Sequence, residues 1–545
     1  MRTTAQANGV SAKAYAGTTG VLLAMNVSAR ARRGLLGFAL ERRVGPGGEP
    51  EWLTSMLAFP GMPHAPGDPI PTKDAPVQKF RWSDYRVYPN TEYEYTVHPV
   101  YGEPGRPRVQ PGPSVQVRTA GTEEREHVVL FNRAAAASQA FSRKFPDVEK
   151  ALDAARRAGR PPPPLPPEAL DWLSRGVLEQ IVGFVDRAVD ASWALDIAIC
   201  EYELGEIVAA VEAAHRRGVN VRVVYHAKPG DPQTAENERH LAGLPPAVKR
   251  RRVTQKICHH KFIVLSRIEG GGRRPVAVLC GSTNFTENGV YRQANVVHVV
   301  GRSAAAEKYL ELFEVLFGGS TPVQTRAFVD STDPIDTQAP LYLGFSPRSN
   351  RADLRAFVAE VKAAGRDVLF CTAFDLYDGL EEALLGLPHD PILRLGLQNS
   401  RSKITGFHRD RTANFSATAM LSRGLEGFLK ESTKGQRGNI LIHTKLIVID
   451  FTSEAPTVIS GSHNLSISAS EGNDENFLVL RGNADVADCY GVELMRLYDH
   501  YRFRWAMREQ KQALTLAEDD SWTARYFERG SLHRRDRISF GVPVR

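Results

Sequence analysis

Two stretches of the chain place a histidine and a lysine two residues apart, directly before an apolar run. The pairs are His259 with Lys261 and His443 with Lys445. Side chains alternate along a strand, so a histidine and a lysine at this spacing lie on the same face. The apolar runs that follow, at 262–265 and 446–449, predict buried strands. Each stretch therefore presents one imidazole and one ammonium together from a strand.

Small polar residues follow each His-Lys pair after a comparable gap, within a Gly-Ser-x-Asn motif. A further polar or acidic residue comes 11 residues after each of the two asparagines. The set comprises Ser282, Asn284 and Asn295 after the first pair, and Ser462, Asn464 and Glu475 after the second. Asp450 also follows the second pair, at a position where the first copy has Ser266. So particular an arrangement, present twice, indicates a duplicated site.

These residue types are suited to phosphoryl transfer without a metal or another cofactor. Lysine and asparagine side chains bind the non-bridging oxygens of a phosphate and stabilise the charge that develops in the transition state. One histidine attacks phosphorus and forms a covalent intermediate. The other protonates the leaving oxygen and then activates water or an alcohol. Both copies are needed, because attack and departure occur on opposite sides of phosphorus.

The paired motifs resemble those of the phospholipase D superfamily, which carries H-x-K-x4-D and G-S-x-N twice around one active site. The resemblance extends over residues 125–505. It implies two duplicated α/β domains with mixed sheets about a pseudo-twofold axis. It also implies metal-independent hydrolysis or transfer of a phosphodiester through a phosphohistidine. The superfamily includes phospholipases, cardiolipin synthases, nucleases and DNA-repair enzymes, so the motifs indicate the reaction better than the substrate.

The resemblance also implies a role for each residue. His259, Lys261, His443 and Lys445 are expected to be catalytic, and Ser282, Asn284, Asn295, Asp450, Ser462, Asn464 and Glu475 are expected to bind or orient the phosphate. In the family, the acid after Gly-Ser-x-Asn hydrogen-bonds the histidine of its own copy. Glu475 would then hold His443 and raise its pKa. Asn295 would orient His259 without lending it charge. A neutral imidazole suits a nucleophile and a protonated one suits a general acid, so we expect His259 to attack and His443 to donate the proton.

The length of 545 residues predicts several domains. Short strand-like runs separated by Pro- and Gly-rich turns predict an N-terminal β-sandwich, and the stretch 90–102 weakly resembles a fibronectin type III domain. An α/β alternation then begins near residue 168 and repeats after a polar linker at 319–340. The expected division is a flexible tail at 1–20, a β-sandwich at 21–120, phospholipase D-like domains at 121–320 and 321–510, and a C-terminal tail at 511–545.

The composition, with 42% hydrophobic and 24% charged residues, is that of a soluble globular protein. No apolar run is long enough to span a membrane and no signal peptide is evident, and five scattered cysteines are typical of the reducing cytoplasm. The net charge of +7 mildly favours an anionic partner. Basic residues near both motifs either line the mouth of the site or form solvated charge runs, and they lie at 249–256 and at Arg401, Lys403, Arg409 and Arg411.

The sequence thus predicts a cytoplasmic phosphodiesterase acting on a phospholipid or a nucleic acid. Two alternatives remain open. One is a nuclease specifically, and the other is a catalytically degenerate protein that recognises a partner through its N-terminal sandwich. A single chain supplies the complete site, and the oligomeric state is left open. Glu201 and Glu203 follow a predicted strand and are expected at the surface.

Overall fold

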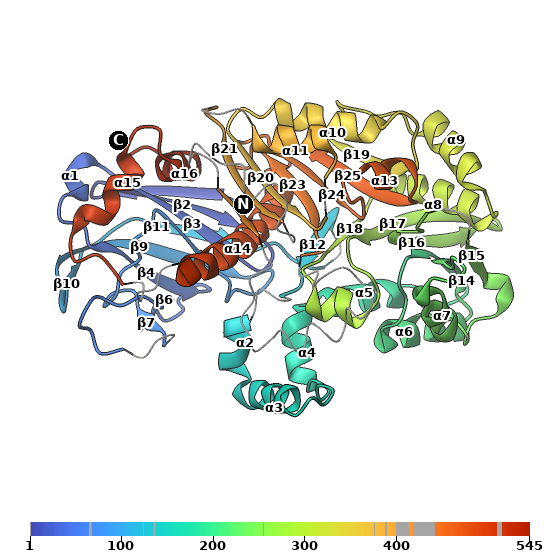
Figure 1. Ribbon diagram of the computed structural model, residues 1–545, viewed down its shortest axis with the longest axis horizontal. Coiled ribbons are helices and arrows are strands. Elements are labelled where there is room, and N and C mark those ends of the chain that lie inside the picture. The colour runs from blue at the N-terminus through green and yellow to red at the C-terminus, as the bar shows by residue number, and fades with distance from the viewer. Residues whose placement is uncertain are drawn as a thin grey trace.

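Two seven-stranded sheets and a set of smaller N-terminal sheets make up the computed structural model (Figure 1). It describes residues 2–64, 68–123, 125–133, 138–253, 256–374, 376–386, 390–398, 414–417, 442–509 and 515–544. Among these residues, no helix is long and apolar enough to cross a membrane. The large sheets carry the two His-Lys pairs, so they are described first.

The two large sheets have the same strand order and the same strand directions. The first runs β12 (His127–Phe131), β18 (Val296–Val300), β17 (Gly272–Gly281), β16 (Lys261–Glu269), β13 (Trp193–Ile199), β14 (Asn220–His226) and β15 (Lys249–Arg252). The second runs β19 (Leu341–Ser346), β25 (Glu475–Arg481), β24 (Thr457–Gly461), β23 (Lys445–Ile449), β20 (Asp367–Thr372), β21 (Leu393–Gln398) and β22 (Asn414–Ala417). Three strands at one edge of each sheet are parallel and the others pair antiparallel. The expectation of two duplicated mixed sheets is confirmed.

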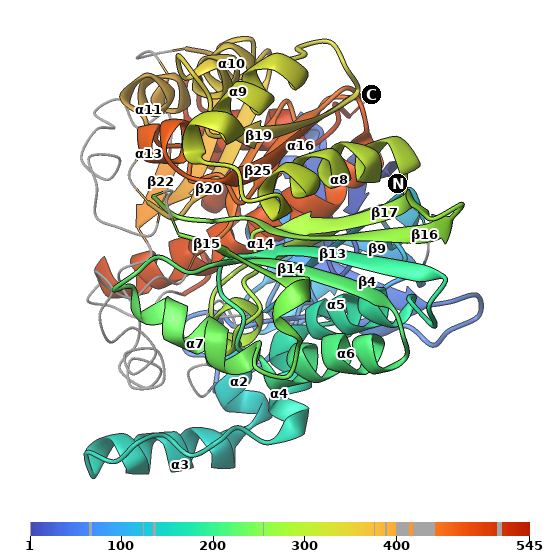
Figure 2. The ribbon, with the colours of Figure 1, turned by 90° about the vertical axis from the view of Figure 1, so that its right-hand side faces the viewer.

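Helices cover both faces of each large sheet. The outer face of the first packs on α5 (Val177–Asp186) and α6 (Gly205–Arg216), and that of the second on α10 (Ala352–Lys362) and α11 (Asp378–Leu385). The inner faces share one hydrophobic core with α8 (Ser303–Phe317) and α14 (Ala484–Glu509), and α8 lies between the two sheets in Figure 2. Strands covered on both faces are apolar throughout, which is why 262–265 and 446–449 are fully buried.

The N-terminal region forms antiparallel sheets, as expected, but they begin at residue 2. One contains β1 (Arg2–Ala7), β2 (Val10–Ala16), β3 (Val21–Val27) and β8 (Arg81–Asp84), and the other contains β4 (Gly37–Val44), β5 (Glu51–Trp52), β9 (Glu92–Glu103), β10 (Arg106–Val109) and β11 (Ser114–Arg118). The prediction of a flexible tail at 1–20 is wrong, because every residue of β2 is buried. Arg2 also forms an ion pair with Asp488 in α14, at 2.8 Å.

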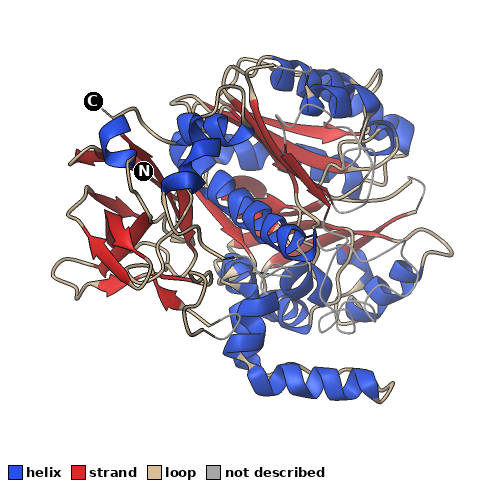
Figure 3. Ribbon diagram, turned by 60° about the vertical axis from the view of Figure 1, so that its left-hand side comes forward, coloured by secondary structure: helices blue, strands red, loops and turns tan. Residues whose placement is uncertain are grey.

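The C-terminal segment packs on the N-terminal sheets, so the prediction of a separate tail at 511–545 is also wrong for its described part. It forms η6 (Asp520–Thr523), α15 (Ala524–Phe527) and α16 (Leu532–Phe540). Trp522 and Tyr526 belong to the same core as the N-terminal strands. The hydroxyl of Tyr15 donates to the carbonyl of Phe540 at 2.7 Å. The two ends of the chain therefore lie close together (Figure 3).

Shorter elements complete the fold, and α2 and α3 project from the body of the molecule in Figure 1. They are α1 (Ala29–Arg32), β6 (Thr54–Ser55), β7 (Ile70–Pro71), α2 (Ser138–Lys144), α3 (Pro146–Arg157), α4 (Pro167–Ser174), α7 (Pro232–His240), η2 (Pro246–Val248), η3 (Asn288–Arg292), α9 (Pro322–Thr332) and α13 (Ile467–Glu471).

Candidate active site

The two His-Lys pairs meet at the junction of the two sheets. They stand at the beginnings of β16 and β23, which occupy the centre of their sheets. The rings of His259 and His443 lie with their centroids 6.2 Å apart, and both side chains are buried. Lys261 and Lys445 are buried beside them. The four residues predicted to be catalytic therefore form one cluster.

Backbone hydrogen bonds between the halves hold both histidines in place. The amide of His259 donates to the carbonyl of Asp474 at 2.9 Å. In the same way, the amide of His443 donates to the carbonyl of Ala294 at 3.0 Å. His259 is thus bound to the residue before Glu475, in the second half. His443 is bound to the residue before Asn295, in the first half. The relation is reciprocal, so neither half assembles its site alone.

Glu475 holds His259, not His443. The Nδ1 hydrogen of His259 is donated to Oε2 of Glu475 at 2.6 Å. The hydroxyl of Ser462 donates to the same oxygen at 2.7 Å. The predicted pairing of Glu475 with the histidine of its own copy is therefore wrong, because the strand that begins at Glu475 directs its first side chain across the junction.

Asn295 holds His443 in the equivalent way. Nδ1 of His443 donates to Oδ1 of Asn295 at 3.0 Å and lies 3.2 Å from the carbonyl of Ser282. The Ser282 hydroxyl donates to the same Oδ1 at 2.8 Å. Nδ2 of Asn295 donates to the carbonyl of Gly289 at 2.9 Å, which turns the amide oxygen toward the histidine. The predicted contact of Asn295 with His259 is corrected accordingly.

Burial keeps both imidazoles neutral in the free site. It lowers the pKa of His259 to about 4, although Glu475 acts in the opposite direction. It lowers the pKa of His443 well below its usual value, with Lys445 and Lys261 acting in the same direction. Burial opposes the ionisation of Glu475, yet contact with His259 brings the Glu475 pKa down to about 2. With each Nδ1 hydrogen donated, each Nε2 is left as the reactive nitrogen.

The two lysines take equivalent positions. Nζ of Lys261 donates to the carbonyl of His259 at 2.7 Å, and Nζ of Lys445 donates to the carbonyl of His443 at 2.6 Å. An ammonium has three hydrogens, so each lysine retains donors for an anion. Burial lowers the pKa of Lys445 well below its usual value, and the positive charge of Lys261 adds to this effect. An anion between the two lysines would relieve their repulsion.

Asn284 and Asn464 end the two Gly-Ser-x-Asn motifs. Their amide oxygens are buried without a hydrogen-bond partner in the described part of the chain. Nδ2 of Asn284 donates to Oε2 of Glu201 at 2.7 Å. Buried polar atoms normally have a partner, so these oxygens mark a place for a ligand or water.

Glu201 is a residue of the site that the sequence interpretation assigned to the surface. Burial raises its pKa, while the charge of Lys261 opposes the shift. Ile199 pairs with Lys261 in the first sheet, and Cys371 pairs with Leu446 in the second. This register makes Phe374 the counterpart of Glu201. The two positions differ in chemistry although the halves are duplicates.

Phe374 gives the second half an aromatic wall. The centroid of the Phe374 ring lies 6.4 Å from that of His443 and 6.0 Å from Nζ of Lys445. The side chain is 36% exposed, so it remains accessible to a bound group. One side of the site is therefore acidic and the other aromatic. Comparison of the two aligned copies could have indicated this difference, because Glu201 and Phe374 follow equivalent strands.

Asp450 does not belong to the site. It stands at the opposite end of β23 from Lys445, about 16 Å away along the strand. Its carboxylate accepts the backbone amides of residues 365–367 at 2.7–3.2 Å. The prediction that Asp450 binds or orients phosphate is therefore corrected to a structural role. Ser266 lies equally far from the cluster, in β16 beside a β-bulge, so this departure leaves the first motif intact.

The basic run at 249–256 is bound to the protein itself. Arg252 forms a buried ion pair with Asp474, with both guanidinium–carboxylate distances at 3.0 Å. Nζ of Lys256 donates to Ser468 at 2.6 Å, and Nε of Arg250 donates to the carbonyl of Phe317 at 2.7 Å. Arg252 and Lys256 thus join the two halves and Arg250 binds within its own half, so these three residues do not form a free basic mouth. The second predicted basic group, Arg401, Lys403, Arg409 and Arg411, lies outside the described residues.

Comparison with known proteins identifies one part of the chain. Residues 188–317 match the protein family described as cardiolipin synthase, PLD-like domain. This span contains the first His-Lys pair and the first Gly-Ser-x-Asn motif. No curated protein matches the chain.

Several solved structures are similar to the chain at low identity. Polyphosphate kinase from Porphyromonas gingivalis shows 12% identity and a TM-score of 0.40 over 63% of this chain and 54% of its own. Phosphatidylserine synthase from Haemophilus influenzae shows 13% identity and a TM-score of 0.39 over 60% and 84%. Yeast tyrosyl-DNA phosphodiesterase shows 12% identity and a TM-score of 0.32 over 54% and 86%. The chain thus spans about half the length of the polyphosphate kinase.

Proposed function

Since the chain carries a phospholipase D-like domain at residues 188–317, we propose that it hydrolyses or transfers a phosphodiester through a covalent phosphohistidine. The observation that carries the proposal is the arrangement of the two imidazoles. Their rings lie 6.2 Å apart, and each Nδ1 hydrogen is donated to an acceptor from the opposite half. Two Nε2 atoms are thereby available on the two sides of one phosphorus atom.

The reaction proceeds in two displacements. Nε2 of His259 bonds to phosphorus while the bond to the leaving oxygen breaks, and Nε2 of His443 supplies a proton to that oxygen. Water or an alcohol then gives its proton to His443 and attacks phosphorus, and the bond to His259 breaks. The products of hydrolysis are an alcohol and a phosphate monoester. His443 acquires its initial proton when the phosphodiester anion binds, because the anion favours the imidazolium.

The assignment of His259 as nucleophile now rests on a different contact. Its ring becomes positively charged when Nε2 bonds to phosphorus. The carboxylate of Glu475 is fully buried and lies 2.6 Å from Nδ1, so it stabilises that charge. The neutral amide of Asn295 lends His443 no such stabilisation, so its proton is more readily released to the leaving oxygen.

The lysines and asparagines bind the non-bridging oxygens in this proposal. Lys261 and Lys445 each keep free ammonium donors, and the amides of Asn284 and Asn464 lie beside the cluster. Glu201 and Phe374 line the two sides and differ in polarity, which supports a substrate whose two ester groups differ. The basic run at 249–256 favours neither a phospholipid nor a nucleic acid as that substrate, and the comparison of substrate classes below distinguishes them. We further propose that the N-terminal sheets form a sandwich and that a pseudo-twofold axis relates the two halves.

An activated diester tests the covalent mechanism. Bis(4-nitrophenyl) phosphate has a leaving group that needs no proton, so His443→Asn should release one equivalent of nitrophenolate in a burst and then stop. His259→Ala should give no burst. Digestion of the stalled His443→Asn enzyme should yield a phosphorylated peptide containing His259. A phosphorylated peptide containing His443 in wild type would reverse the assignment.

Natural substrate classes are compared in the same assay. Single- and double-stranded DNA, RNA and phosphatidylcholine vesicles are offered to wild type and to His259→Ala in EDTA. Nucleic-acid cleavage that the mutation abolishes would identify a nuclease, and choline release that it abolishes would identify a phospholipase. Absence of any burst with the activated diester would support the degenerate binding protein instead.

A further inference from the structure

A large cavity lies between the N-terminal sheets and the first α/β half. Its volume is about 2180 Å³, and its walls come from residues 76–89, 122–133, 171–187, 496–502 and 515–536. None of the catalytic residues is among the described residues that line it. The cavity is therefore separate from the site where the two His-Lys pairs meet.

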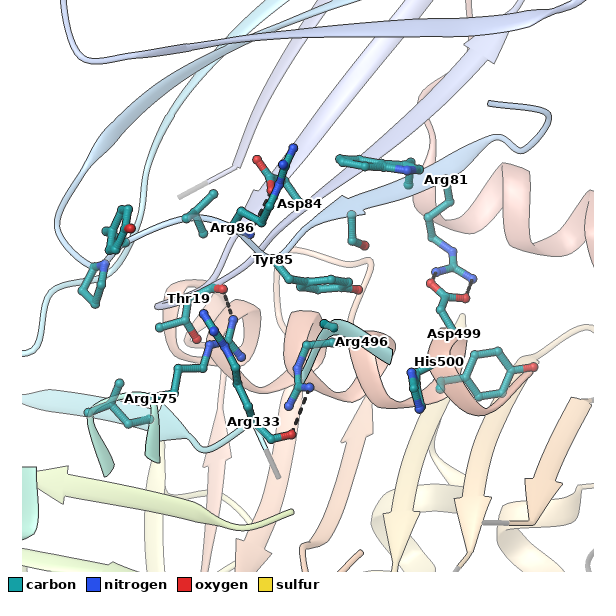
Figure 4. A pocket seen from close by; sticks show the side chains of 18 of the residues that line it. Thr19, Arg81, Asp84, Tyr85, Arg86, Arg133, Arg175, Arg496, Asp499 and His500 are labelled. Atoms are coloured by element: carbon teal, nitrogen blue, oxygen red, sulfur yellow. Dashed lines mark hydrogen bonds and ion pairs between the residues drawn. The ribbon is translucent and has the colours of Figure 1, made fainter. Parts of the chain in front are cut away.

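Three guanidinium groups gather at one place in this cavity. Figure 4 shows Arg133, Arg175 and Arg496 together on one side and the ion pair of Arg81 with Asp499 away from them. They come from three parts of the chain, since Arg133 follows β12, Arg175 lies between α4 and α5, and Arg496 is in α14. Such a cluster is formed by the fold and is not a run of surface charge.

One carboxylate, Glu493, pairs with two of the three arginines. Glu493 accepts from Nη1 of Arg175 at 2.8 Å and from Nε of Arg496 at 2.6 Å. No acidic side chain in the described part of the chain pairs with Arg133, whose guanidinium lies 4.5 Å from the ring of Trp172. Three positive charges and one negative charge leave a net charge of +2. The cavity as a whole shows the same bias, with twelve lysines and arginines but seven acids among its described lining residues.

One atom of this cluster lacks the partner that a ligand could supply. Nε of Arg175 is buried with no hydrogen-bond partner among the described residues, and the residue as a whole is 9% exposed. Arg175 also occupies the left-handed region at φ 54°, where the break between α4 and α5 directs its side chain to Glu493 and to the carbonyl of Thr19. Burial, then Arg175 and Arg496, lowers the pKa of Arg133 to about 9. A bound anion would accept from Nε of Arg175 and would raise the pKa of Arg133.

The rest of the wall is apolar beside the charged cluster. Trp172, Phe184 and Leu130 line it from the α/β half, and Phe80 and Trp82 line it from the N-terminal sheets. Phe80, Phe184 and Leu130 are covered by the surrounding core, but Trp172 and Trp82 are only partly buried. A small inorganic anion would leave these two indoles uncovered. A phosphate monoester carries about −1.5 to −2 charges at neutral pH, which matches the net +2 of the cluster.

We propose that this cavity binds a phosphate monoester that bears an apolar body. The phosphate contacts Arg133, the free Nε of Arg175 and the remaining donors of Arg496. The apolar body packs on Trp172 and the aromatic side chains opposite. Bound in this way, the ligand joins the N-terminal sheets, the first half and α14. The proposal does not depend on the catalytic mechanism above.

Binding of decyl phosphate to the full chain tests the proposal by calorimetry, below the concentration at which the ligand forms micelles. Wild type should bind it and should bind inorganic phosphate and 1-decanol at least about tenfold more weakly, because each lacks one half of the ligand. Arg133→Gln should weaken binding about tenfold or more. Arg133→Lys keeps the charge but not the planar group. Its affinity for decyl phosphate should therefore lie between those of wild type and Arg133→Gln.

Two control variants test whether decyl phosphate binds in this cavity. Arg267 stacks on Trp193 with 3.7 Å to the ring centroid, as Arg133 stacks on Trp172, and it does not line the cavity. Arg267→Gln should therefore bind as wild type does. His259→Ala should also bind as wild type does, because the catalytic site is elsewhere. Equal affinity of Arg133→Gln and wild type, loss of binding in His259→Ala, or no binding to wild type would each overturn the proposal.

Discussion

The histidines of the two His-Lys pairs differ in the atom that accepts their Nδ1 hydrogen. A carboxylate holds His259 and an amide holds His443, although serine hydroxyls support both acceptors in the same way. A carboxylate stabilises a positive imidazole more strongly than an amide does. The asymmetry therefore separates the roles of two residues that are otherwise equivalent.

Replacing Glu475 by Gln should reduce the rate of phosphoenzyme formation by about 10²- to 10⁴-fold, because the charge opposite the reacting ring is lost. The burst with bis(4-nitrophenyl) phosphate measures this step directly. Asn295→Asp is the matched variant at His443. It should raise the pKa of His443 and extend activity toward higher pH, since the general acid then keeps its proton longer. Equal burst rates for Glu475→Gln and wild type would contradict this account.

His260 should make the protein sensitive to acid without taking part in the reaction. It is fully buried, and burial lowers its pKa to about 3 although Glu475 opposes the shift. Because the unfolded chain takes up the proton below about pH 6.5 and the folded chain does not, stability is complete above pH 6.5 and falls as the pH decreases toward 3. Between pH 6.5 and 5, wild type should lose about 2 kcal/mol more than His260→Asn. Urea unfolding at the two pH values measures the difference, and identical losses would refute it.

At the scale of elements, the ends of β23 have separate tasks. Its first residue carries the catalytic ammonium, and the residue after its end, Asp450, binds the turn before β20. Asp450 adopts φ 52°, a left-handed conformation in which its carboxylate reaches three successive amides. The H-x-K-x4-D stretch of the second copy thus combines the His-Lys pair at one end with turn stability at the other.

Asp450→Ala should lower stability and leave catalysis intact. Loss of the charged acceptor for the three amides of residues 365–367 costs about 1–3 kcal/mol in the free energy of unfolding. The burst amplitude per folded molecule should not change. Asn464→Ala is the contrasting variant. We propose that its amide binds the substrate phosphate, so its loss should slow the burst with little effect on unfolding. Asp450→Ala with normal stability and a lost burst would return this residue to the site.

At the scale of the whole molecule, the two ends of the chain complete one region. The N-terminal strands share a core with Trp522 and Tyr526 from the C-terminal segment. The indole of Trp522 donates to the carbonyl of Leu35 at 2.8 Å. Arg2 is meanwhile paired with Asp488 in α14, which packs between the large sheets. The N-terminal sheets are therefore attached to the α/β halves at several places.

Trp522→Ala should destabilise the N-terminal region by about 3–5 kcal/mol, because a large buried side chain and its hydrogen bond are lost. Ile538→Ala in the same segment is a control, since Ile538 is 44% exposed. It should change stability by about 0.5 kcal/mol or less. Thermal unfolding followed by circular dichroism distinguishes the variants. Equal melting temperatures for the two would show that the C-terminal segment does not support this region.

The sequence alone was sufficient for the duplicated motifs, the two mixed sheets and the meeting of both His-Lys pairs. Spacing of two residues before an apolar run determines which side chains share a strand face, and that property is local. The phospholipase D-like domain predicted from these motifs is confirmed over residues 188–317. The fibronectin type III resemblance and the remaining domain boundaries stay predictions.

Only the tertiary structure decided which acceptor holds which histidine. Glu475 and Asn295 occupy equivalent positions in two copies, so no feature of the sequence distinguishes pairing within a half from pairing across the junction. The crossing follows from the contacts of His259 with Asp474 and of His443 with Ala294, which join residues far apart in the chain. The same reason explains the terminal segments. Their apolar residues are too few to form a core alone and become ordered because they pack on each other.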